Sequence, residues 1–131
     1  MRATFTSLGI VLAAMLVTTT LVRAEGLFDS QPGDAYLKNL TNEDLGKKQI
    51  EDIGLVAMML TAREVCGASH IDDERVFRII ANMVRESGLP ENVFMTKSVD
   101  LARINAAEMR SDTKRVIKEC DLVKSRLGPR E

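Results

Sequence analysis

Two cysteines, Cys66 and Cys120, constrain the fold of this chain more than any other residues, because 54 positions separate them along the sequence. Each lies among apolar residues that recur at helical spacing, and in an exported chain such a pair is most simply a structural disulfide. A redox pair is the alternative, but exchange-active cysteines usually lie close together, as in Cys-x-x-Cys, near a helix start that stabilises the thiolate. The sequence therefore predicts a Cys66–Cys120 bridge.

The N-terminus supports export, because residues 1–24 have the profile of a signal peptide. A basic residue, Arg2, precedes an apolar stretch from Leu8 to Val17, and three threonines interrupt this stretch before it reaches the roughly 20 residues of a membrane-spanning helix. The side chains before the junction at Ala24 suit a signal peptidase. We expect a periplasmic or secreted protein with no stable membrane anchor after cleavage; an uncleaved anchor is the alternative.

The expected mature chain has the size of a single domain and a mildly acidic charge. Cleavage removes 24 of the 131 residues and two of the 18 basic side chains, leaving 107 residues with 16 basic and 19 acidic side chains. A net charge of −3 gives no electrostatic reason to bind nucleic acid. Residues 25–33 carry two glycines and a proline without periodicity, which predicts a flexible leader before a helical domain at residues 34–131.

Apolar residues at helical spacing predict helices throughout this domain. A short helix is expected at residues 34–40, and a second runs from a cap within residues 41–44 to Cys66, where Gly67 ends it. Asp72 caps a third helix, which stops at Gly88. These features predict an all-α fold, a small helical bundle of three to four helices with one disulfide and a long C-terminal helix.

The long C-terminal helix is predicted from Pro90 to Leu127. Apolar residues follow one another by four and three positions from Met95 onward, which is the heptad seam of a packed helix. A break with a new cap at residues 111–112 is the alternative. Because this seam exceeds the length of the other helices, part of it is expected to contact a protein partner or a second copy of the chain. The expected contact residues are Ala102, Ala106 and Met109.

The sequence contains no recognisable catalytic, metal or cofactor motif. His70, the only histidine, precedes Asp72, Asp73 and Glu74, but acids at a helix start are the ordinary polar first turn. They supply neither the ligands of a zinc site nor the alternating spacing of a calcium loop. The methionines lie at helical spacing among leucines and isoleucines, which is typical of core packing. Asn39 begins a glycosylation triplet, which matters only in a glycosylating host.

Because the sequence shows no recognisable catalytic motif, we expect a binding role rather than an enzymatic one. The leading interpretation is an exported, extracytoplasmic, non-enzymatic interaction protein, such as an inhibitor, an accessory factor or a chaperone-like binder. The alternative is a small-ligand or lipid carrier, in which methionine and leucine side chains line a pocket between the helices.

The signal-peptide interpretation predicts that the exported protein begins at Glu25, because the junction after Ala24 ends an apolar stretch of the length that signal peptides have. N-terminal sequencing of the protein recovered from its native compartment checks this. A chain that still begins at Met1 would contradict both the cleavage and the expected absence of an anchor.

Overall fold

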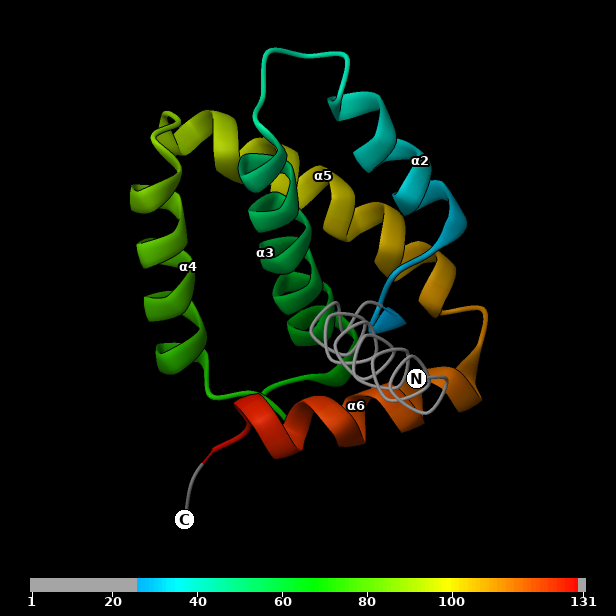
Figure 1. Cartoon of the computed structure of the whole chain (residues 1–131). Coiled ribbons are helices and arrows are strands. Elements are labelled where there is room, and N and C mark those ends of the chain that lie inside the picture. The colour runs from blue at the N-terminus through cyan, green and yellow to red at the C-terminus, as the bar shows by residue number, and fades with distance from the viewer. Residues whose placement is uncertain (1–25, 130–131) are drawn as a thin grey trace, which may run out of the picture.

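The computed structural model describes residues 26–129, and within this range the chain folds into helices without a strand (Figure 1). The all-α prediction is therefore confirmed, and the predicted signal peptide at residues 1–24 lies outside the described residues. The described range holds five helices rather than three to four: α2 Gln31–Leu40, α3 Lys47–Cys66, α4 Asp73–Ser87, α5 Glu91–Met109 and α6 Thr113–Leu127.

Helix α3 is the central element, and it packs against each of the other four helices. Figure 1 shows it between α4 on one side and α2 on the other, with α5 crossing behind it and α6 lying across its C-terminal end. Its sequence explains this position, because apolar residues occupy nearly every side of the second half of the helix. Its buried apolar residues are Ile53, Val56, Ala57, Met59 and Ala62.

Local capping signals set most of the helix boundaries. The carboxylate of Asp72 accepts a hydrogen bond from the Arg75 backbone N–H at 3.2 Å, which confirms the predicted start of α4. The helix ends before Gly88, whose φ of 74° is the left-handed conformation that glycine adopts without a steric penalty. The start of α3 differs from the prediction, because Gly46 is its N-cap and residues 41–44 form a turn.

The predicted long C-terminal helix is wrong, since residues 90–127 form two helices. α5 ends at Met109, and the carboxylate of Asp112 accepts a hydrogen bond from the Arg115 backbone N–H at 3.1 Å to begin α6. Two helices that each turn one apolar stripe inward satisfy the same three- and four-residue spacing as one long helix. The cap at Asp112 therefore decides where the chain breaks.

The predicted disulfide is confirmed. Cys66, the last residue of α3, is bonded to Cys120 in the middle of α6, and their Cα atoms lie 5.6 Å apart. This bridge closes a 54-residue separation that contains all of α4 and α5. It is compatible with an oxidising compartment outside the cytoplasm.

Replacing both cysteines, as in Cys66→Ser/Cys120→Ser, should lower the free energy of unfolding by about 4 kcal/mol, because the closed loop restricts the unfolded chain. Urea unfolding of the oxidised protein and of the variant measures the difference. The wild-type protein with a reductant is the matched control and should unfold like the variant. Equal stability of the oxidised and reduced proteins would contradict a structural role for the bridge.

Candidate contact surface on helix α6

Helix α6 lies at one end of the molecule, where three ties hold it against the rest of the chain (Figure 1). The disulfide joins Cys120 to the end of α3. At the C-terminal end of α6, the Leu127 carbonyl accepts a hydrogen bond from the Asp72 backbone N–H at 2.8 Å. The third tie is a set of polar contacts with the segment that precedes α2.

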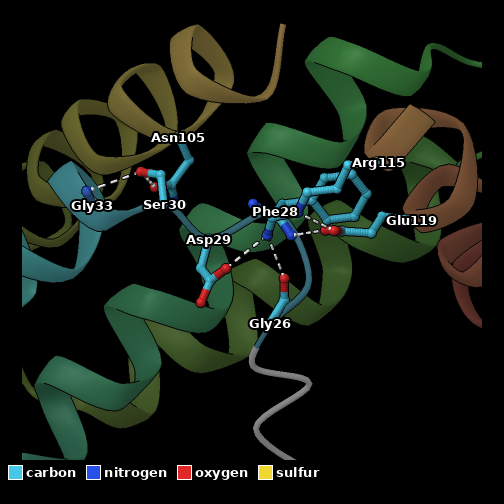
Figure 2. A network of polar contacts seen from close by, with 8 residues as sticks. All are labelled: Gly26, Phe28, Asp29, Ser30, Gly33, Asn105, Arg115 and Glu119. Carbon is cyan, nitrogen blue, oxygen red and sulfur yellow. Dashed lines mark hydrogen bonds and ion pairs between the residues drawn. The ribbon is translucent and has the colours of Figure 1, made fainter. Parts of the chain in front are cut away.

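Figure 2 shows this third tie, which centres on Arg115 and Glu119. Nη2 of Arg115 donates hydrogen bonds of 2.7 Å to the Gly26 carbonyl and to Oδ1 of Asp29. Nε of Arg115 donates to one carboxylate oxygen of Glu119, and the Phe28 backbone N–H donates to the other. Glu119 is only 7% exposed, so these donors replace the water that its carboxylate loses on folding.

The charges around this tie influence one another. Burial disfavours the charged form of Arg115, but the hydrogen bonds to Glu119 and Asp29 more than offset it, so its pKa is raised. The pKa of Asp34 is also raised, first by burial and then by the negative charge of Asp29, while Arg115 acts in the opposite direction. Arg115 therefore remains charged and is the cation around which this end of the chain is organised.

Phe28 fixes the same segment from the inside of the molecule. Its side chain is 0% exposed in the main hydrophobic core. Its backbone φ of 60° is left-handed, a conformation that costs a residue with a side chain about 1–2 kcal/mol and persists only where surrounding contacts offset it. Within the leader expected at residues 25–33, Phe28 therefore packs into the core, and α2 begins three residues earlier than expected, at Gln31.

The segment also packs closely against α5. Oγ of Ser30 donates a 2.8 Å hydrogen bond to Oδ1 of Asn105 and accepts one from the Gly33 backbone N–H at 2.9 Å, which caps α2. A Cβ atom at Gly33 would lie 2.0 Å from Oδ1 of Asn105, so only glycine allows this approach. Ser30 and Gly33 make these contacts, and neither belongs to a periodic apolar pattern. Sequence periodicity therefore did not reveal them.

The outward side of α6 combines apolar and basic side chains. Ile117 is 60% exposed and Leu122 is 41% exposed, whereas the inward stripe of the helix contains the buried Cys120 and Val123. Four basic residues of α6 are also exposed, namely Lys114, Lys118, Lys124 and Arg126. Within residues 26–129, no acidic side chain forms an ion pair with any of these four. This outward side is hereafter called the α6 outer face.

The structure places the predicted contact residues elsewhere, because Ala102, Ala106 and Met109 are all buried in the core. Ala102 lies beside α3, where its carbonyl is 3.4 Å from the hydroxyl of Thr61. The expectation that this part of the seam is an exposed contact is thus corrected: the inward side of α5 covers α3. The signal that was missed is Ile117, an isoleucine one position outside the seam that passes through Val116.

Other features of the described chain offer little chemistry. His70 lies in the loop before α4, and no group of three metal-ligating side chains occurs among residues 26–129. An open hollow on the outer side of α5 is lined by Met95, Thr96, Val99, Asp100 and Arg103. None of the helices α2 to α6 combines the length and the apolar character that crossing a membrane requires.

The chain matches no protein-family model, no curated protein and no solved structure. Within residues 26–129, the α6 outer face combines exposed apolar side chains with basic side chains that form no ion pair.

The buried position of Phe28, in the segment that contacts α6, predicts that two phenylalanines differ in how much they stabilise the fold. Phe28→Ala should lower the free energy of unfolding by about 3–5 kcal/mol, because it empties a fully buried site. Phe77→Ala is the matched control, since Phe77 is 44% exposed on α4 and contacts the Arg63 guanidinium, so the variant should lose only about 1–2 kcal/mol. Urea unfolding measures both, and equal losses would show that Phe28 does not anchor the segment.

Proposed function

We propose that this protein is an exported, non-enzymatic interaction protein that binds a partner through the α6 outer face. The observation that carries the proposal is the exposure of Ile117, which is 60%, on a helix that is tied to the rest of the chain at three places. Single exposed apolar residues are common on protein surfaces. Here the residue belongs to a firmly held element that also exposes Leu122 and four cations.

The rigidity of α6 supports a binding role, because a helix that is already ordered loses little further conformational entropy when it binds. The disulfide and the Arg115 contacts hold the helix at Cys120 and Arg115. Among the described residues, Ile117, Leu122 and the four basic side chains of the α6 outer face remain exposed. Inhibitors, accessory factors and chaperone-like binders all require such a surface.

The disulfide also supports a location in the periplasm or outside the cell. Disulfides persist in oxidising compartments and are rare in the cytosol. The Cys66–Cys120 bridge, together with the signal-peptide profile of residues 1–24, favours an exported protein over a cytosolic one.

Site-specific photo-crosslinking in the native compartment tests the proposed surface. With the photoreactive residue p-benzoylphenylalanine in place of Ile117, we expect one discrete adduct with a partner polypeptide. The same substitution at Ala81, an exposed position on α4, is the matched control and should give at most about a tenth of that yield.

Competition shows whether this adduct reports specific binding. Excess wild-type protein should abolish the adduct, whereas excess Ile117→Asp protein should leave it, because a carboxylate at this position removes the apolar contact. Equal labelling from positions 117 and 81, or equal competition by both proteins, would overturn the assignment of function to the α6 outer face.

A further inference from the structure

The charge of this protein is distributed unevenly, because α6 is net positive while the rest of the chain is net negative. Residues Thr113–Leu127 contain five basic and two acidic side chains, a net charge of +3, while the whole chain carries −1. The remainder of the chain therefore carries −4, and the remainder of the expected exported protein, which lacks Arg2 and Arg23, carries −6. Such an asymmetry creates a field that orients an approaching charged partner and raises its rate of association.

The arrangement of side chains on α6 narrows the kind of partner further. At about 100° per residue, Ile117 and Leu122 lie about 140° apart around the helix axis. Lys114 and Lys118 lie between them, one helical turn apart, and both are exposed. The α6 outer face therefore has two lysines and the acidic Asp121 at its centre, with a net positive charge, and one large apolar side chain on each flank.

From this arrangement we propose that the α6 outer face docks onto an acidic protein surface. Carboxylates of the partner contact Lys114 and Lys118, and apolar side chains of the partner contact Ile117 and Leu122 on the two flanks. The inference rests on the proposed function, and it adds the chemistry of the partner to the location of the surface.

A membrane surface fits this arrangement less well. A helix that lies in an anionic bilayer turns a continuous apolar side toward the lipid. In α6 the two apolar residues are separated by Lys114, Lys118 and Asp121, so those charged groups would enter the apolar layer first. A protein surface can instead offer carboxylates at the centre and apolar groups at the edges.

Titration with defined peptides tests the proposal on the disulfide-bonded exported protein. The probe is a short synthetic peptide of repeating Leu-Glu-Glu units, and its matched control is the Leu-Gln-Gln peptide of equal length. Followed by two-dimensional NMR of the ¹⁵N-labelled protein, the acidic peptide should shift the backbone amides of Thr113–Leu127, weakly at high salt and strongly at low salt. The neutral peptide should not.

A pair of charge-reversal variants separates local contacts from net charge. Lys114→Glu/Lys118→Glu should weaken binding of the acidic peptide by about tenfold or more. Lys38→Glu/Lys47→Glu changes the net charge equally at exposed positions of α2 and α3 and should leave the affinity within about twofold. Circular dichroism confirms that both variants are folded.

Several results would overturn the proposal. Equal losses in the two variants would assign the binding to net charge alone. Sedimentation with phosphatidylglycerol vesicles that depends on Lys114 and Lys118, without peptide binding, would identify a membrane as the partner. Self-association that these lysines control would identify a second copy. If crosslinks from position 117 persist while the acidic peptide fails to bind, the location of the surface stands and the acidic chemistry is wrong.

Discussion

The position of α6 depends on the covalent bond between Cys66 and Cys120. Only a narrow stripe of this helix is buried: its fully buried apolar residues are Cys120 and Val123, and Val116 and Leu127 are partly buried against the core. So little apolar burial gives a fifteen-residue helix a weak hold on the rest of the chain, since most helical stability in proteins comes from packing. The disulfide adds a covalent hold to this packing, because it joins α6 to the end of the central helix, α3.

The ionic tie on the other side of α6 links the start of the domain to its end. Burying the carboxylate of Glu119 is costly unless charged and backbone donors surround it, and Arg115 and the Phe28 backbone N–H provide them. The hydrogen bond to Glu119 also helps to hold the left-handed backbone of Phe28, whose side chain is buried in the core. The segment before α2 and the helix α6 therefore stabilise each other.

Sequence reasoning identified features whose signals are local and missed those that depend on tertiary contacts. The cap at Asp72 and the stop at Gly88 were readable, because each residue acts on its own helix end. The long C-terminal helix was predicted wrongly, since apolar spacing cannot show whether the chain turns at Asp112. Phe28 was missed because it stands alone in a stretch without periodicity, and Ile117 because its exposure depends on which stripe of α6 faces inward.

The weak packing of α6 and its proposed binding role have the same physical origin. A helix that is held mainly by apolar burial must turn its large apolar side chains inward, so few apolar side chains remain exposed for a partner to contact. Because a disulfide and the charged contacts of Arg115 hold α6, Ile117 and Leu122 contribute little to the core and are left at the surface. Substitutions at these two positions should therefore have little effect on the stability of the fold. If the α6 outer face binds a partner as proposed, its side chains can change the choice of partner while the helices keep their arrangement.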